Sequence, residues 1–142
     1  MTTDQNLEVH NIFVSHTWTA SDSFEKLSGL LHMSSGPLAD FRYQFYSVSK
    51  DDPIQNLPSK KHLRAAIEEK MRQCTCVLML GGLYETHQKW IDIESDIARK
   101  LRKRIILIEA WKEKTLSDVE KRAAHAVVKW RDEDVIGAIL KA

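Results

Sequence analysis

The chain alternates short apolar runs with longer stretches in which apolar residues recur at helical spacing. Apolar runs or strict alternation predict strands at residues 11–15, 43–47, 74–80, 104–108 and 124–128. Helical spacing predicts helices at residues 21–33, 60–73, 88–102 and 132–140, with a further short helix before the last strand. Residues 48–59 are polar, contain two prolines and are interpreted as a loop.

Strands that alternate with helices predict a parallel sheet with right-handed crossovers and helices on both faces. Nearly continuous apolar strands agree, because a sheet covered on both faces needs them. Five strands in 142 residues indicate one flavodoxin-like α/β domain spanning residues 1–142. Such sheets bind ligands at the carboxyl ends of their strands. The positions that follow strands are residues 15–18, 48–52, 81–87 and 109–111.

Composition and charge narrow the classes of function. The net charge is +1, so no global field draws the chain to nucleic acid or to an acidic membrane, and neither is expected as a partner. The four basic residues between Lys100 and Arg104 leave a local patch open, although a solvated helix end is the favoured interpretation. The first ten residues lack a signal-peptide pattern and no apolar run reaches 18 residues, so a cytoplasmic location is expected.

Two cysteines, Cys74 and Cys76, lie two apart in an apolar run. In a strand both would point to one face of the sheet. Residues two apart rarely form a disulfide, and a lone C-x-C is a poor metal motif. We interpret them as small buried residues in a reducing compartment. The histidines at 62, 87 and 125 have no ligand spacing with one another or with the cysteines, so no metal site is expected.

Several familiar α/β sites are absent from the sequence. Its five glycines form neither G-x-G-x-x-G nor G-x-x-x-x-G-K, and there is no G-x-S-x-G elbow. The first and third strands end in Ser15-His16 and Leu80-Gly81. The aspartate that accepts phosphate in a response-regulator receiver is therefore missing, which argues against phospho-relay.

Glu94 stands out on physical grounds. At 100° per residue from Trp90, it falls roughly 40° away, inside the apolar stripe of the helix at 88–102. A carboxylate in a buried stripe costs free energy unless it is paired or used. Because this helix follows the third strand, its first turns lie at the ligand end of the sheet, and Glu94 is a candidate functional acid. A structural glutamate bonded to a core tyrosine or histidine is the alternative.

Segments of the chain resemble a known family. Residues 74–100 resemble the third strand and following helix of TIR domains, in which a tyrosine precedes a W-x-x-x-E segment, here Trp90 to Glu94. The first strand, residues 12–15, is similar to the F-[IV]-S opening of the same domains. His16 and Trp18 are similar to the TIR-like proteins of bacterial Thoeris anti-phage systems, the ThsB group. The loop at 48–59 departs from the family because it lacks R-D-x-x-P-G.

The resemblance implies an enzyme, an NAD glycohydrolase or ADP-ribosyl cyclase, which takes NAD as substrate and needs no cofactor. Glu94 would be the carboxylate that cleaves the nicotinamide–ribose bond. The resemblance and the strand-end positions together nominate six substrate-binding residues: Ser15, His16, Trp18, Gly81, Tyr84 and Trp90. A cyclic ADP-ribose product would activate a partner effector by diffusion, and self-association of the chain is possible within this family.

Two other functions stay open. A non-catalytic TIR-like interaction module would not need Glu94. An enzyme similar to nucleoside deoxyribosyltransferases would also use a buried glutamate on a glycosidic bond, but would prefer free deoxynucleosides to NAD. The aromatic residues Trp18 and Trp90 also fit as core or rim residues, and His16 fits as a cap as well as a ligand.

Overall fold

The computed structural model describes residues 9–15, 24–32, 41–47, 60–81, 84–109, 116 and 118–142. Its centre is one sheet with the strands β1 (Val9–Val14), β2 (Arg42–Tyr46), β3 (Cys76–Leu80), β4 (Arg104–Ile108) and β5 (Ala126–Val128). The strand order is β2-β1-β3-β4-β5, and all four pairings are parallel. The predicted flavodoxin-like α/β architecture is confirmed.

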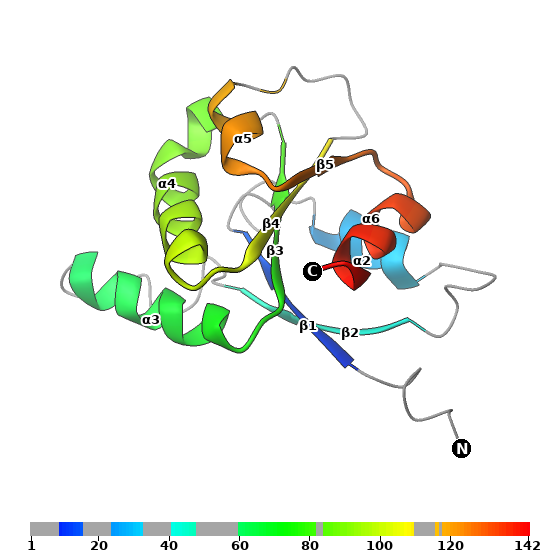
Figure 1. Cartoon of the computed structure of the whole chain (residues 1–142), viewed down its shortest axis with the longest axis horizontal. Coiled ribbons are helices and arrows are strands. Elements are labelled where there is room, and N and C mark those ends of the chain that lie inside the picture. The colour runs from blue at the N-terminus through cyan, green and yellow to red at the C-terminus, as the bar shows by residue number, and fades with distance from the viewer. Residues whose placement is uncertain are drawn as a thin grey trace.

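Helices cover both faces of the sheet (Figure 1). They are α2 (Phe24–His32), α3 (Lys60–Arg72), α4 (Tyr84–Lys100), α5 (Asp118–Ala123) and α6 (Asp132–Leu140). Helices α2 and α6 lie on one side, and α3, α4 and α5 on the other (Figure 1). None of the helices in the described ranges is long and apolar enough to cross a membrane.

Each face of the sheet has its own core, and strand β1 contributes to both. Ile12 and Val14 belong to the cluster under α2 and α6, whereas Phe13 belongs to the cluster under α3 and α4. All three side chains are fully buried. Successive strand residues point to opposite faces, so a strand covered on both sides must be apolar at every position. This is why the buried strands appear as continuous apolar runs in the sequence.

Several element boundaries differ from those predicted. Strand β1 begins at Val9, two residues before the predicted start at residue 11, because Val9 pairs with Arg42 of β2. Helix α4 begins at Tyr84 and not at residue 88, because its first turn is polar and so carries no apolar spacing to detect. It ends at Lys100, where the next turn closes through a hydrogen bond from the Lys103 amide to the Ala98 carbonyl.

The last strand is also shorter than predicted. It begins at Ala126 rather than at residue 124. The Ala124 amide donates to the Glu120 carbonyl, which extends the turn of α5 across the start of the predicted strand. Helix α2 and helix α6 lie within the predicted ranges, and residues 21–23, 33 and the loop at 48–59 fall outside the described residues.

The prediction that Cys74 and Cys76 share one face of a strand is wrong. Strand β3 begins only at Cys76, so Cys74 precedes the strand and does not follow its alternation. Cys74 packs in the cluster under α3 and α4, and Cys76 packs in the cluster under α2 and α6. Both thiols are free and buried, which confirms their interpretation as small core residues.

Burial should also make both thiols unreactive in the folded chain. It raises the pKa of Cys74 to about 12 and that of Cys76 to about 11, from an ordinary value of 9.0. Because the thiolate is the nucleophile, a chromogenic disulfide reagent at pH 8 should label neither thiol in buffer and both in guanidinium. The unfolded thiols ionise first, so stability should fall as the pH rises from 9 towards 11. Rapid labelling of the native protein would contradict the packing described.

Candidate functional site

Ser15 lies where strand β1 ends, at the carboxyl edge of the sheet. Its amide donates to the Leu78 carbonyl of β3 at 2.9 Å, which continues the sheet pairing by one residue. Side chains alternate along the strand, so Ser15 points to the same face as Phe13, the face that α3 and α4 cover. Its side chain is fully buried. A hydroxyl in that position needs a polar partner from the covering helix.

Glu94 is the residue on α4 that meets this requirement. Its neighbours along the inner stripe of the helix, Ile93, Ile97 and Ala98, are all buried in the cluster under α3 and α4. Glu94 itself is 0% exposed. On the other side of the helix, Asp92 is exposed. The predicted stripe, with a glutamate inside it, is therefore present in the structure.

The two polar residues meet directly. Ser15 Oγ donates a hydrogen bond of 2.7 Å to Glu94 Oε1, between residues 79 positions apart in the sequence. The length is typical of a hydroxyl that donates to a carboxylate. The bond fixes one carboxylate oxygen at the end of β1. It therefore orients the glutamate at the edge where sheets of this type bind their ligands.

Ion pairs on the outer surface hold α4 against α3. Arg64 of α3 pairs with Asp96, and Glu68 pairs with Lys100 at 3.1 Å. Arg72 pairs with Glu68 as well, at 2.9 Å. Each exposed pair contributes little alone, and a connected group contributes more. These contacts bridge the two helices on the side opposite the Ser15–Glu94 hydrogen bond, and so help to fix the helix that carries the glutamate.

Gly81 follows β3, and its surroundings give it a structural role. Its amide donates to the Ile108 carbonyl at 2.9 Å. A Cβ placed on Gly81 would lie 2.3 Å from the Leu116 side chain and 3.3 Å from the Ile108 carbonyl oxygen. Leu116 therefore occupies the space directly beside the glycine. A role for Gly81 in substrate binding stays a prediction.

The structure describes the side chains of only some of the other nominated residues. Trp90, one turn before Glu94 on α4, is half-buried and packs against the cluster under α3 and α4. Tyr84 is the first residue of α4, and its side chain falls outside the described residues, as do His16 and Trp18. Within the described chain, the structure thus brings together Ser15 and Glu94 from the nominated set.

Sequence reasoning missed a second buried glutamate. Glu120 on α5 is only 4% exposed and lies beside an apolar cavity that Met79, Ile91 and Leu107 help to line. A signal was available, because Glu120 precedes the apolar pair Ala123-Ala124 at helical spacing. The short α5 segment offered too few apolar residues to define a buried face.

Removing the Ser15 hydroxyl should destabilise the fold measurably. In Ser15→Ala, a buried carboxylate oxygen loses its hydroxyl donor, which costs about 1–3 kcal/mol. For a chain of this size the melting temperature should fall by about 2–4 °C per kcal/mol, measured by circular dichroism. Ser28→Ala, at a half-buried serine of α2, is the control and should change the melting temperature little. Equal melting temperatures for both variants would show that the hydrogen bond contributes nothing.

Comparison with known proteins gives one family, together with structural likenesses that are weak. The family model described as "Thoeris protein ThsB, TIR-like domain" matches residues 13–115. A search of curated proteins gave no match. Two structures of aspartate aminotransferase from Thermus thermophilus, one with maleate and one a tetra mutant, each align over 88% of this chain at 11% identity and a TM-score of 0.38. The chain spans about a third of their length, 32% and 34%, and a likeness this low carries no argument about function.

Proposed function

Because the chain belongs to the TIR-like family of Thoeris protein ThsB, we propose that it cleaves the nicotinamide–ribose bond of NAD, with Glu94 as the catalytic carboxylate. The observation that carries the proposal is the hydrogen bond from Ser15 to a fully buried Glu94 at the carboxyl edge of the sheet. A buried carboxylate that lies on an apolar helix stripe is costly to keep for the fold alone. Strand ends are also where parallel sheets bind nucleotides.

Cleavage of this bond does not need a strong general acid. In NAD the nicotinamide nitrogen is cationic, so it leaves as neutral nicotinamide when its bond to ribose C1′ breaks with both electrons. The ribose is left as an oxocarbenium-like cation. A carboxylate beside that cation stabilises it electrostatically, and it can also accept hydrogen bonds from the ribose hydroxyls. We assign these interactions with the substrate to the Glu94 carboxylate, which the hydrogen bond from Ser15 to Oε1 orients.

The cation must then be captured by a nucleophile. Attack by water gives ADP-ribose, with loss of one proton. Attack by a hydroxyl or ring nitrogen of the same molecule gives a cyclic ADP-ribose. We propose the cyclic product, because a small nucleotide released from the site can diffuse to a separate effector of a Thoeris-type defence system. His16, Trp18, Tyr84 and Trp90 would contact the nucleotide and limit access of water.

The test is a direct assay for the two products. The purified chain is incubated with NAD at low and high protein concentration, and nicotinamide and the ADP-ribose species are followed by mass-resolved chromatography. We expect nicotinamide release, accompanied by a species of ADP-ribose mass less one water. A product of ADP-ribose mass would support the cleavage but reject the cyclisation.

Two substitutions make the assay specific. Glu94→Gln should abolish release. Glu120→Gln makes the same isosteric change at a second buried glutamate of the described chain and should leave release unchanged. A further outcome is that the protein releases no nicotinamide at either concentration, with or without extract from phage-infected cells. That result would reject the enzyme hypothesis in favour of the non-catalytic interaction module.

A further inference from the structure

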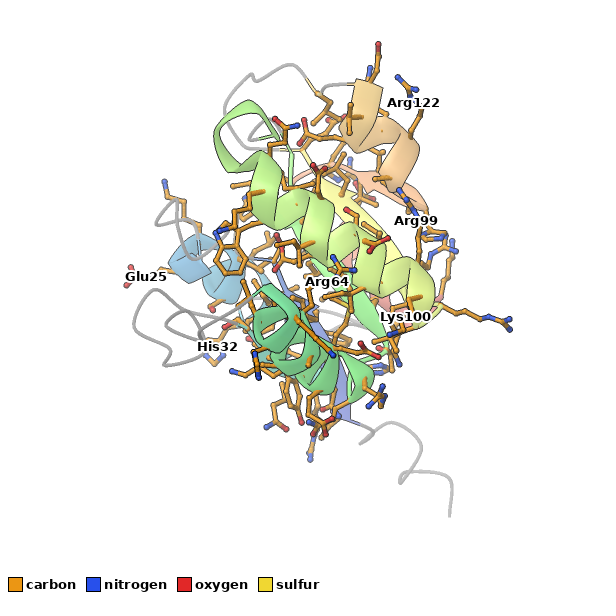
Figure 2. The ribbon with its side chains drawn as sticks, turned by 90° about the vertical axis from the view of Figure 1, so that its left-hand side faces the viewer. Glu25, His32, Arg64, Arg99, Lys100 and Arg122 are labelled. Carbon is orange, nitrogen blue, oxygen red and sulfur yellow. The ribbon has the colours of Figure 1, made fainter. Side chains whose placement is uncertain are left out.

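The outer side of α4 carries a groove that the proposed chemistry does not use. It has a volume of about 400 Å³ and lies between α4, the α3 residue Arg64 and the α5 residues Val119 and Ala123. This volume is within the range of small-molecule sites. Figure 2 shows this outer side of α4, with Arg64 in front of the helix and Arg99 near its far end.

Three residues of α4 form a row in this groove that changes from apolar to cationic. Ile91, Ser95 and Arg99 all line the groove and follow one another at spacings of four residues. This spacing places them on successive turns of one helix face, about 6 Å apart along the axis at each step. Ile91 is buried at one end of the row, and Arg99 is exposed at the other. A ligand that lies along the row would therefore meet apolar surface at one end and hydrogen-bond donors at the other.

The hydroxyl of Ser95, in the middle of the row, has no partner. The residue is only 5% exposed, and its Oγ makes no hydrogen bond with any part of the chain that the structure describes. A serine inside a helix often donates to the carbonyl four residues earlier, here that of Ile91, but Ser95 does not. A buried hydroxyl without a partner is destabilising, and alanine is the better helix former. An acceptor supplied by a ligand would explain why a serine stands at this position.

Arg99 offers the second set of donors. Its guanidinium makes no hydrogen bond or ion pair with any other described residue. Arg64 and Asp96, which also line the groove, pair with each other. Asp92 lines the groove too, but it already has an interaction within the chain, so we assign it no contact with a ligand. A guanidinium and a hydroxyl on one row can both donate to a carboxylate.

The α5 side of the groove is apolar. Val119 and Ala123 line it, and they lie across from the row on α4. Ala123 is buried, but Val119 is 42% exposed, so a ligand in the groove would cover apolar surface that is now open to water. At about 25 cal/mol per Å², covering this surface favours a ligand with an aliphatic chain.

We propose that this groove binds an aliphatic monocarboxylate. Its carboxylate accepts hydrogen bonds from the Arg99 guanidinium and, after rotation about the Cα–Cβ bond of Ser95, from the Ser95 hydroxyl. Its chain lies along the row against Ile91 and Val119. A cation with the same chain would leave both donors without an acceptor, and an anion without a chain would leave Val119 open to water. The proposal does not depend on the NAD chemistry.

The experiment is an NMR titration of the ¹⁵N-labelled chain with octanoate, octylammonium and acetate. We expect octanoate to shift the amides of residues 91–99 and 118–123, with a dissociation constant on the order of 1 mM. Octylammonium has the same chain with the opposite charge, and acetate has the carboxylate without the chain, so each should bind at least about 10-fold more weakly. Equal binding of octylammonium would overturn the proposal in favour of an apolar surface without a carboxylate site. Equal binding of acetate would overturn it in favour of an adventitious ion only.

Variants test the groove residue by residue. Arg99→Gln should weaken octanoate binding about 10-fold and remove the advantage of octanoate over octylammonium. Ser95→Ala should weaken octanoate binding several-fold without lowering the melting temperature, because the hydroxyl makes no hydrogen bond with the described chain. Lys89→Gln removes a positive charge from the same helix outside the groove and should leave the affinity unchanged. Unaltered affinity in either Arg99→Gln or Ser95→Ala, or shifts confined to other elements, would overturn the proposal.

Discussion

Glu94→Gln is expected to lower the rate of nicotinamide release from NAD by about 10³-fold or more, which corresponds to about 4 kcal/mol of lost transition-state stabilisation. The amide keeps the size of the carboxylate and still accepts a hydrogen bond, so Ser15 keeps an acceptor. What disappears is the negative charge beside the developing ribose cation. The loss should therefore be in kcat, with a small change in KM.

The fold of this variant can be checked independently. Its melting temperature and its amide NMR spectrum should stay close to those of the unaltered chain, because the hydrogen bond and the packing of α4 are preserved. Glu94→Asp keeps the negative charge on a side chain that is one methylene shorter. This variant should retain more activity than Glu94→Gln. Undiminished nicotinamide release in a well-folded Glu94→Gln protein would assign the chemistry to another group.

The second large effect is on stability. Phe13→Ala should lower the free energy of unfolding by about 3–5 kcal/mol. Phe13 is 0% exposed and belongs to the cluster that also holds Val77, its register partner on β3, and Ile93 of α4. Truncation of the ring leaves a cavity between the sheet and the helix that carries Glu94. Urea denaturation followed by circular dichroism measures the change.

Val9→Ala is the matched control for this substitution. Val9 lies on the same strand but is 49% exposed, so its truncation should cost less than about 1 kcal/mol. The ratio between the two effects tests the assignment of Phe13 to the core. A loss of less than about 1 kcal/mol in Phe13→Ala would mean that α4 does not pack on the sheet as described. Phe13→Ala should also lower the rate of nicotinamide release, because the cavity that it leaves adjoins the helix that carries Glu94.

Local patterns in the sequence determined most of the fold. Apolar runs and helical spacing are properties of neighbouring residues, and they located five strands and the helices between them. Their alternation implied parallel pairing and helices on both faces, because right-handed crossovers allow little else. The same periodicity predicted that Glu94 lies inside the inner stripe of α4, and its side chain is indeed fully buried. The least accurate boundaries were at polar turns, such as the start of α4 at Tyr84, where no apolar residue marks the helix.

Contacts between distant residues depended on the tertiary structure. The bond between Ser15 and Glu94 joins positions 79 apart, and no local pattern encodes which hydroxyl reaches which carboxylate. The two cysteines separated onto opposite faces because sheet pairing starts at Cys76, a register set by the neighbouring strands. Sequence by itself therefore determined which strands and longer helices form and which face of α4 turns inward. The packing of those elements decided which inward polar groups meet, because a hydrogen bond requires two chain segments to be placed within about 3 Å of each other.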